Sequence, residues 1–597
     1  MAKIKVSDYI ASRLKNIYDI KNVFMVSGGG AMHLNDSFGK YIPYICNHNE
    51  QACAIAAEGY AKASSKLPVV NVTTGPGGLN CLNGVFGQWT DSVPVLYISG
   101  QVKRATTLAS CPDLNLRQLG DQEADIISVV KPLTKYAVMV KNPLEIKYHL
   151  DRAVYEATTG RKGPVWLDIP IDVQAAVIDE QELIDFDISC KPPSTKEDCK
   201  ITEVLSRLSL AKTPLIVAGH GIRLSGMKHT FLDILKNLNI PVVTTFNGFD
   251  LLNEDTPQYI GRIGTIGQRA GNFALQNADL VLFLGTRNNI RQISYNWENF
   301  ARNAYKIVVD IDKAELEKPL VKPDMAIHAD LADFLPLLKE SLTSIDKPQW
   351  LTFCRDLKER YSFGNTKEYS QTGDKINVYY FVRRLTELMS ENDVCVTANG
   401  TAIIASVQTA MVKNNQRIFS NSGDASMGYD LPAAIGACVA NNKKNTICIA
   451  GDGSLMMNLQ ELQTLKHHNL PVKIFILNND GYSSIKQTQT NFFEGRNTGA
   501  GTNSGVSIPD FVKVGSAFDI KSIRLESPHE IDNTIKNVLS AKGPVLCDVI
   551  VNPDYIFTPK LSSRKLEDGT MISPSLEDMY PFLPRDEYEK NFYSPLK

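Results

Sequence analysis

Short apolar, β-branched runs recur along the whole chain, and helical stretches separate them. Examples are VPVLYIS, TPLIVAG, ADLVLFLG, YKIVVDID, NTICIAG and LPVKIFILN. A run that is apolar on both faces is typical of a parallel strand that helices cover on both sides. Such sheets bind their ligands at the carboxyl ends of the strands. The sequence therefore predicts an α/β fold of doubly wound parallel sheets.

Chain length and two polar stretches set the number of domains. A chain of 597 residues is too long for a single hydrophobic core. The polar stretches 189–200 and 341–350 are candidate linkers. They divide the chain into three α/β domains, 1–185, 200–340 and 365–555. The first and third close on similar strands, GPVWLDIP and GPVLCDVI, which suggests a shared plan.

The last residues, 556–597, form a tail rich in proline, charge and aromatic side chains. This tail is too apolar for a plain disordered end. We interpret it as a covering segment or an active-site lid.

Composition argues against several classes of protein. Hydrophobic residues make up 43% and charged residues 21% of the chain, which is typical of a soluble globular protein. The net charge of -2 gives no indication of nucleic-acid binding, and no apolar run approaches the ~20 residues of a membrane span. The N-terminal residues lack the apolar core of a signal peptide, and the cysteines are scattered without a CxxC pair. We therefore expect a cytoplasmic protein without nucleic-acid or membrane partners.

The most informative segment is 447–480, where two apolar strands end in polar corners. The first strand ends in GDG at 451–453, and the second ends in an Asn-Asn pair. Glycines let backbone amides approach a ligand, and the helix that follows favours an anion. Asp452 beside an anion requires a cation between them, and the amide oxygen of Asn479 suits that cation. Alone, GDG would indicate only a tight turn. Together the two corners predict Mg²⁺ or Ca²⁺ bridging a diphosphate.

This segment, GDGSLMMNLQELQTLKHHNLPVKIFILNN, resembles the thiamine diphosphate site of the acetolactate synthase (acetohydroxyacid synthase) family. The resemblance covers nearly the whole chain and implies a pyrimidine-binding, a middle and a diphosphate-binding domain. It implies that thiamine diphosphate is bound through Mg²⁺. The implied metal ligands are the side chains of Asp452 and Asn479 and the carbonyl of Gly481. The implied contacts to the cofactor itself come from Gly451, Gly453 and Ser454.

The same family requires one glutamate in its first domain, which activates the pyrimidine ring of the cofactor. The stretch NHNEQACAIAAEGYAKAS matches the family pattern with one change, because Asn49 separates His48 from Glu50. The resemblance makes Glu50 the catalytic candidate and gives Glu58 a structural role. By itself, Glu50 would be interpreted as a helix-start glutamate that the helix dipole favours.

Three further stretches of the first domain match the family. The loop FMVSGGGAMHLND places Gly28, Gly29 and Gly30 beside the reacting carbon, with Gly29 as a catalytic candidate. The turn TTGPGGLN places Gly75 and Asn80 near the cofactor. Gln122, in LGDQEADIISVV, falls where the family has an active-site glutamine.

The third domain supplies further implied contacts to thiamine diphosphate. Gly400 and Thr401 stand where the family often has Gly-Gln-His, and only the glycine is retained. Met427, in SGDASMGYDLPAAIGA, would be the apolar wedge under the cofactor. Ile485 keeps an apolar position of the helix after the metal site. In the same helix Ser484 and Thr488 replace a bulky Met and Trp of the family.

The middle domain resembles the FAD-carrying domain of acetolactate synthases, through LIVAGHGIRLSG, IPVVTTFNGFDLL and KIVVDIDKAEL. We expect FAD in a structural role, because the implied reaction has no redox step. The residues implied to line it are Gly219, Gly221, Thr245, Gly285, Arg287, Asp310 and Asp330.

The resemblance implies that pyruvate is decarboxylated and that its two-carbon unit is transferred to an acceptor carbonyl. Ser484 and Thr488 would enlarge the acceptor pocket and make it polar. The chain looks closest to the flavin-containing carboligases of branched-chain deoxysugar biosynthesis, so we expect a nucleotide-activated keto-deoxysugar as acceptor. The alternatives are an acetolactate synthase that condenses two pyruvates, a simple 2-oxo-acid decarboxylase, and a cofactor-binding regulatory homologue. The family places its cofactor between two subunits, which implies a homo-oligomer, either a dimer or a tetramer.

Overall fold

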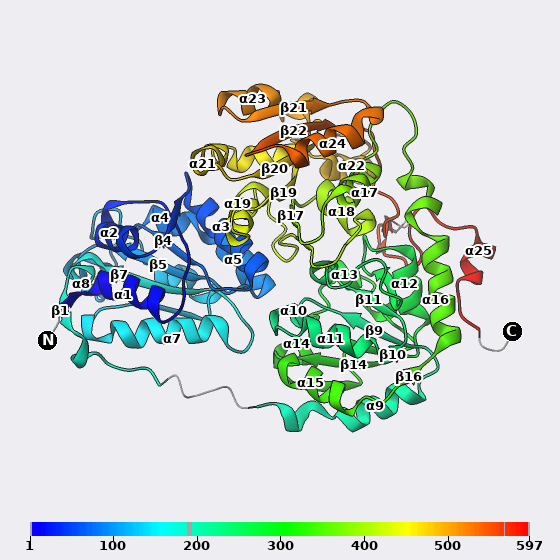
Figure 1. Ribbon diagram of the computed structural model, residues 1–597, viewed down its shortest axis with the longest axis horizontal. Helices are drawn as coiled ribbons and strands as arrows, with labels where there is room; N and C mark the ends of the chain where they lie inside the picture. Colours follow the sequence, from blue (N-terminus) through cyan, green and yellow to red (C-terminus); the bar gives the residue numbers. More distant parts are fainter. Residues whose placement is uncertain (1–2, 188–193, 566–567, 595–597) are drawn as a thin grey trace.

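Three six-stranded parallel sheets form the framework of the computed structural model (Figure 1). The structure describes residues 3–187, 194–565 and 568–594. Helices cover both faces of each sheet, so the predicted doubly wound α/β fold is confirmed. Within the described ranges, no helix combines the length and the apolar character needed to cross a bilayer.

The first and third sheets have the same topology. Numbered along the chain within its own domain, each sheet has the strand order 2-1-3-4-6-5. The strands of the first are β2 (Val23–Met25), β3 (Tyr44–Cys46), β4 (Val69–Val72), β5 (Leu96–Gln101), β6 (Tyr136–Met139) and β7 (Val165–Pro170). Those of the third are β17 (Val394–Thr397), β18 (Arg417–Phe419), β19 (Thr446–Gly451), β20 (Val472–Asn478), β21 (Lys521–Leu525) and β22 (Val545–Ile550). The shared topology that the similar closing strands suggested is therefore confirmed.

The middle sheet has a different topology. Its strands are β9 (Pro214–Ala218), β11 (Val242–Thr244), β12 (Tyr259–Arg262), β13 (Leu280–Leu284), β14 (Tyr305–Asp310) and β15 (Met325–His328). Numbered along the chain, they lie in the order 3-2-1-4-5-6. That order is the one found in dinucleotide-binding folds, where ligands lie at the point of strand-order reversal.

Helices alternate with the strands in each domain. The first domain carries α1 (Val6–Asn16), α2 (Met32–Tyr41), α3 (Glu50–Ser64), α4 (Pro76–Asn80), α5 (Leu82–Asp91) and α7 (Ile146–Thr158). The middle domain carries α9 (Ile201–Leu210), α11 (Lys228–Leu235), α12 (Arg269–Asn277) and α15 (Leu331–Ser341). The third carries α17 (Val378–Leu388), α18 (Thr401–Thr409), α19 (Asp430–Ala440), α20 (Asp452–Leu455), α21 (Glu461–His468), α22 (Ser483–Phe492), α23 (Phe511–Ala517) and α24 (Ile531–Ser540).

Helices α3 and α19 join the first domain to the third (Figure 1). Both helices are rich in alanine and glycine, which lets their backbones approach closely. A Cβ at Gly59 would lie 2.1 Å from the carbonyl oxygen of Ala433. A Cβ at Gly436 would lie 1.7 Å from that of Ala56. The contact therefore requires these glycines.

The stretch 341–350, expected to be a linker, is structured. It contains β16 (Ile345–Asp346), which pairs with β10 (Leu238–Asn239), and the start of α16 (Pro348–Arg360). Helix α16 buries Trp350, Leu351 and Cys354 against the middle domain, so that domain continues beyond residue 340. Residues 189–193 of the other expected linker lie outside the described residues.

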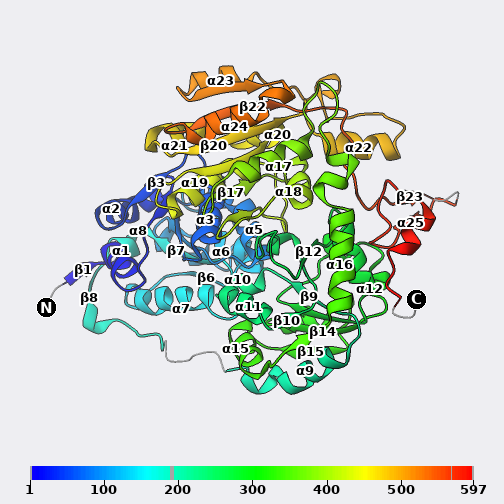
Figure 2. The same ribbon diagram turned by 45° about the vertical axis from the view of Figure 1, so that its right-hand side comes forward.

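The tail covers the middle domain. Leu576 and Met579 are buried, and the Asn272 amide in α12 donates to the carbonyl oxygen of Leu576. Figure 2 shows the tail and α25 (Arg585–Lys590) on the outer side of α12 and α16. Of our two interpretations, the described part of the tail fits the covering segment.

Candidate active site

Asp452 lies at the carboxyl end of β19, where the neighbouring parallel strand β20 also ends. Its carboxylate is buried and accepts three backbone hydrogen bonds. Oδ1 accepts one from Gly453 N (2.6 Å), and Oδ2 accepts two, from Asn479 N and Gly481 N (3.0 Å each). Burial raises the pKa of Asp452 to about 6, and the three N–H groups oppose that rise. The parallel register of β19 and β20 therefore brings the two predicted corners together.

The amide of Asn479 has an oxygen without a partner. Asn479 Nδ2 donates to Thr401 Oγ1 at 3.1 Å, whereas Oδ1 is buried and accepts no hydrogen bond. A buried polar oxygen without a partner is costly unless a ligand satisfies it. The Asp452 carboxylate and this oxygen are hard donors of the kind that Mg²⁺ prefers. No cluster of three or more His, Cys, Asp or Glu in the described chain competes for a metal. The donor set fits the implied cation.

Gly453, Tyr482 and Met427 pack together beside this corner. A Cβ at Gly453 would lie 2.2 Å from the Tyr482 ring and 3.3 Å from Met427 Cε. Ser454 Oγ accepts a hydrogen bond from Gly428 N at 2.8 Å, which fixes the segment that carries Met427. Our sequence reading missed Tyr482, although it directly follows Gly481 in the recognised motif. Gly451 has open space on its Cβ side, where the nearest atom is Ser454 Cβ at 3.6 Å.

Gly400 and Thr401 begin helix α18 at the same edge of the sheet. Gly400 has φ +65, a left-handed conformation that favours glycine. The Ser484 hydroxyl, on α22, lies 3.8 Å from where a Gly400 Cβ would stand. The third domain thus gathers Thr401, Met427, Asp452, Asn479 and Ser484 around one corner.

The other predicted α22 residues lie nearer solvent. Ile485 is 45% exposed, and Thr488 is also exposed. Thr488 Oγ1 donates to the carbonyl oxygen of Ser484 at 3.0 Å, so only its lone pairs remain for a ligand. Gln487, in the same helix, donates to the carbonyl oxygen of Tyr555 at 2.9 Å and anchors α22 to the start of the tail.

Glu50 is the first residue of α3, and its neighbour Asn49 is the N-cap. The Asn49 side chain accepts a hydrogen bond from Gln51 N at 2.8 Å, so the residue that departs from the family pattern has a capping function. Glu50 Oε2 accepts a hydrogen bond from Asn80 Nδ2 at 2.9 Å. A Cβ at Gly77 would lie 3.6 Å from Glu50 Oε1. The structure thus brings Glu50 and Asn80, two predicted residues, into direct contact.

The glycine loop packs against the turn at residues 73–80. A Cβ at Gly28 would lie 2.5 Å from Thr73 Cβ, and Gly30 N donates to Thr73 Oγ1 at 3.1 Å. Gly29 has no atom within 4 Å of its Cβ position. The first-domain loop therefore keeps Gly29 facing open space.

Gly75 and Gln122 meet next to this loop. Gly75 has φ +58, and a Cβ there would lie 1.8 Å from the Gln122 carbonyl oxygen. Gln122 is exposed and itself has a positive φ of 59. The backbone of Gln122, rather than its side chain, makes the contact with the cofactor turn.

The two groups of site residues lie in different domains of the chain. Figure 1 shows α4, which carries Asn80, on the left and α22 at the upper right. No hydrogen bond or ion pair between described residues joins Glu50 to Asp452 or Asn479. Within one chain, Glu50 and Asp452 therefore make no direct polar contact, and we call the two groups of residues around them the half-sites.

A cavity of about 430 Å³ lies at the predicted FAD position. Six of the seven predicted residues line it: Gly221, Thr245, Gly285, Arg287, Asp310 and Asp330. The seventh, Gly219, packs behind them, because its Cβ would lie 2.3 Å from the Gly285 carbonyl oxygen. Burial raises the pKa of Asp310 to about 6. The size and glycine-lined wall of the cavity suit a bound organic cofactor.

Residues from the other two domains also line this cavity, and our reading of the middle domain missed them. Asp91 and Arg161 come from the first domain and Ser422 from the third. Arg161 Nη1 lies 2.5 Å from Asp312 Oδ2 and links the first and middle domains. No local motif could have identified these residues, because only domain packing places them there.

Three family profiles match the chain. They describe the N-terminal TPP binding domain, the central domain and the C-terminal TPP binding domain of thiamine pyrophosphate enzymes. They match residues 4–128, 201–338 and 399–549.

Curated proteins with similar sequences are acetolactate synthases. The large subunit from Lactococcus lactis subsp. lactis is 32% identical over 97% of this chain and 99% of its own length. The isozyme 2 large subunit from Escherichia coli is 31% identical over 89% of this chain and 93% of its own length. Acetolactate synthase 1 from Zea mays is 32% identical over 91% of this chain and 85% of its own length.

Proposed function

Because the chain belongs to the acetolactate synthase family of thiamine diphosphate-dependent enzymes, we propose that it decarboxylates pyruvate and transfers the two-carbon unit to an acceptor carbonyl. One observation carries the proposal. Asn479, whose buried Oδ1 has no partner, donates its backbone N–H to the Asp452 carboxylate where two adjacent strands end. This is the donor set that a metal-bound diphosphate needs.

The residues of the two half-sites divide the work. When bound, thiamine diphosphate supplies the carbon nucleophile and electron sink for decarboxylation. Asp452, Asn479 and the Gly481 carbonyl would hold Mg²⁺. Glu50 holds or moves a proton at Oε1, because its Oε2 is engaged by Asn80. Gly29 leaves room for substrate beside the reacting atoms.

The first candidate acceptor is a second molecule of pyruvate, and the product is then acetolactate. The names of the relatives support it, since all three are acetolactate synthases. They favour this alternative over the deoxysugar acceptor that we expected from the sequence.

A nucleotide-activated keto-deoxysugar is the second candidate acceptor, and helix α22 favours it. Ser484 faces the start of α18, while Ile485 and Thr488 are exposed on the same helix. Small hydroxyl-bearing side chains leave more room for a polyhydroxylated acceptor than Met and Trp do.

Incubation with pyruvate, Mg²⁺ and thiamine diphosphate tests both versions. Rapid acetolactate formation from pyruvate alone supports the first. Slow turnover that a nucleotide-activated keto-sugar accelerates, with incorporation of the two-carbon unit, supports the second. Acetaldehyde as the main product with either acceptor would contradict carboligation and leave a simple decarboxylase.

We also propose that FAD occupies the 430 Å³ cavity in a structural role. The dinucleotide-type strand order of the middle sheet and the glycine-lined wall support it. Absorption spectra and masses of the cofactors released from purified protein test this; absence of flavin from protein purified and reconstituted with FAD would contradict it.

The enzyme further acts as a homo-oligomer in which the first domain of one subunit completes the site on the third domain of another. The separation of the two half-sites in a single chain supports this arrangement. Exposed apolar side chains near both halves support it too, among them Leu79, Phe86, Met456 and Met457.

A further inference from the structure

Helix α18 connects the diphosphate corner with the middle domain. Its first residue, Thr401, accepts the hydrogen bond from Asn479 Nδ2. Its nine residues span about 13 Å, and residues 402–409 are all buried. The opposite end of the helix lies against β12 of the middle domain, through the side chain of Arg262.

Arg262 captures the C-terminal end of α18. This side chain is 2% exposed. Its Nη1 donates to the carbonyl oxygen of Val407 at 3.0 Å, and its Nη2 donates to that of Ala410 at 2.7 Å. The last carbonyls of a helix lack partners within the helix, and a cation there is favoured by the helix dipole. A buried guanidinium from another domain therefore fixes the helix end.

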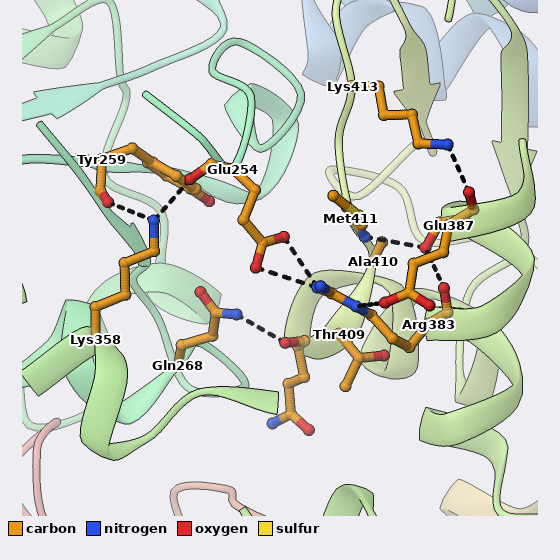
Figure 3. A network of polar contacts seen from close by, with 12 residues as sticks. Glu254, Tyr259, Gln268, Lys358, Arg383, Glu387, Thr409, Ala410, Met411 and Lys413 are labelled. Atoms are coloured by element: carbon orange, nitrogen blue, oxygen red, sulfur yellow. Dashed lines mark hydrogen bonds and ion pairs between the residues drawn. The ribbon is translucent and has the colours of Figure 1, made fainter. Parts of the chain in front are cut away.

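Gln268 reinforces this contact. Its Nε2 donates to the carbonyl oxygen of Gln408 at 2.8 Å, while its Oε1 accepts a hydrogen bond from Arg262 N at 3.1 Å. Figure 3 shows the Gln268 amide directed at the end of α18. Gly261 leaves room for this amide, because a Cβ there would lie 2.6 Å from Gln268 Oε1.

An ion pair between residues outside α18 also joins the same two domains. Arg383, on α17, donates from Nη1 to both carboxylate oxygens of Glu254, at 3.1 and 3.0 Å (Figure 3). The interface thus offers a matched comparison. Arg262 forms hydrogen bonds with the helix that begins at the diphosphate corner, whereas Arg383 pairs with Glu254.

We propose that Arg262, assisted by Gln268, is a positioning residue for the cofactor site. It fixes α18 along its axis and thereby holds the Thr401 hydroxyl against Asn479. The hydrogen-bond ladder of a buried helix resists compression, and a close-packed interior transmits displacement. Loss of the Arg262 hydrogen bonds at the last turn of α18 therefore shifts its first turn. The inference rests on the proposed function, which assigns Asn479 to the metal that holds the diphosphate.

Binding of thiamine diphosphate to the metal-saturated apoprotein, followed by calorimetry, tests the inference. We expect Arg262→Met to weaken binding about tenfold. Arg262→Lys keeps the charge and some of the donors, so its Kd should lie between those of the wild type and Arg262→Met. Arg383→Met should lower the melting temperature but change the Kd by less than about twofold. An unchanged Kd in Arg262→Met, or equal weakening in Arg383→Met, would overturn the inference.

A double-mutant cycle with Thr401→Ala separates positioning from general destabilisation. If Arg262 acts through Thr401, the two losses in affinity are not additive; full additivity would contradict that route. Should Arg262→Met fail to fold, Gln268→Met can replace it, because it removes the hydrogen bond to the Gln408 carbonyl oxygen. This variant should also bind thiamine diphosphate more weakly, and an unchanged Kd would count against the inference. A wild-type protein that binds no thiamine diphosphate refutes the proposed function instead.

Discussion

Glu50 uses one carboxylate oxygen to accept the hydrogen bond from Asn80, and we propose that the other oxygen handles a proton. Glu50→Gln preserves the size of the side chain and removes its ability to take up that proton. We expect cofactor binding close to that of the wild type and at least a hundredfold lower product formation, about the contribution of a general acid or base. Calorimetry with thiamine diphosphate and the pyruvate assay measure the two effects. Near-normal turnover in Glu50→Gln would refute the assignment.

Asp452 is the one carboxylate of the proposed metal site. Asp452→Ala removes an anionic ligand and leaves three backbone N–H groups without their acceptor. We expect purified protein to lose thiamine diphosphate on gel filtration even with Mg²⁺ present. Asp480→Ala, at an exposed neighbouring position, serves as control and should retain the cofactor. Equal cofactor content in the two variants would contradict the ligand assignment.

Asp168 gives a pH dependence that can be tested without the cofactor. It is fully buried, and burial raises its pKa to about 7, while hydrogen bonds from Ser99 and Gln101 oppose the rise. Between pH 3.8, the pKa of an unperturbed aspartate, and pH 7 the unfolded chain releases this proton and the folded chain retains it. Stability therefore falls as pH rises through this window.

The comparison is between wild type and Asp168→Asn, which cannot ionise. We expect the melting temperature of the wild type, relative to that of the variant, to be a few degrees lower at pH 8 than at pH 5. Thermal denaturation at the two pH values measures this difference. A constant difference across the pH range would show that Asp168 titrates alike in both states.

At the scale of elements, one buried carboxylate contributes to holding the tail. Glu577 Oε1 accepts hydrogen bonds from Arg302 Nη2 (2.9 Å) and Tyr588 Oη (3.1 Å), and its Oε2 accepts one from Gln276 (2.9 Å). Glu577→Ala leaves the Arg302 charge without its partner, which costs about 3 kcal/mol. We expect a lower thermal transition and faster proteolysis of the tail.

The control for Glu577 lies on the same tail. Asp586 is exposed and lies 3.7 Å from Lys590 Nζ, and an exposed pair contributes little to stability. Asp586→Ala should leave the thermal transition unchanged. Similar behaviour of the two variants would contradict the view that the tail is held through Glu577.

At the scale of the whole molecule, two half-sites in one chain predict complementation between subunits. A subunit with Glu50→Gln keeps an intact third domain, and a subunit with Asp452→Ala keeps an intact first domain. If each active site joins two subunits, a mixed dimer has one intact site. Random mixing then restores about a quarter of wild-type activity. Co-expression with two affinity tags followed by the pyruvate assay measures it; no recovery in isolated mixed dimers would mean that each site lies within one subunit.

The sequence by itself determined the fold class and the chemistry of the corners. Apolar runs on both strand faces dictate parallel sheets, because only helices on both sides can cover them. GDG and the Asn-Asn pair are short local motifs, each at the end of a strand. The parallel pairing of β19 and β20 then brings the two strand ends together. Asp452 and Asn479 could be paired from sequence for this reason, as could Glu50 with the start of its helix.

Tertiary structure alone decided the contacts between domains. Asp91 and Ser422 reach the FAD-type cavity, the tail covers α12, and Arg262 holds the far end of α18. Each of these contacts joins segments far apart in the chain. No local sequence pattern predicts them, because an arginine or aspartate that contacts another domain has the same local sequence features as one exposed to solvent. The stretch 341–350 was expected to be a linker for the same reason: its polar residues are local, whereas the face of the middle domain that buries Trp350 exists only in the folded molecule.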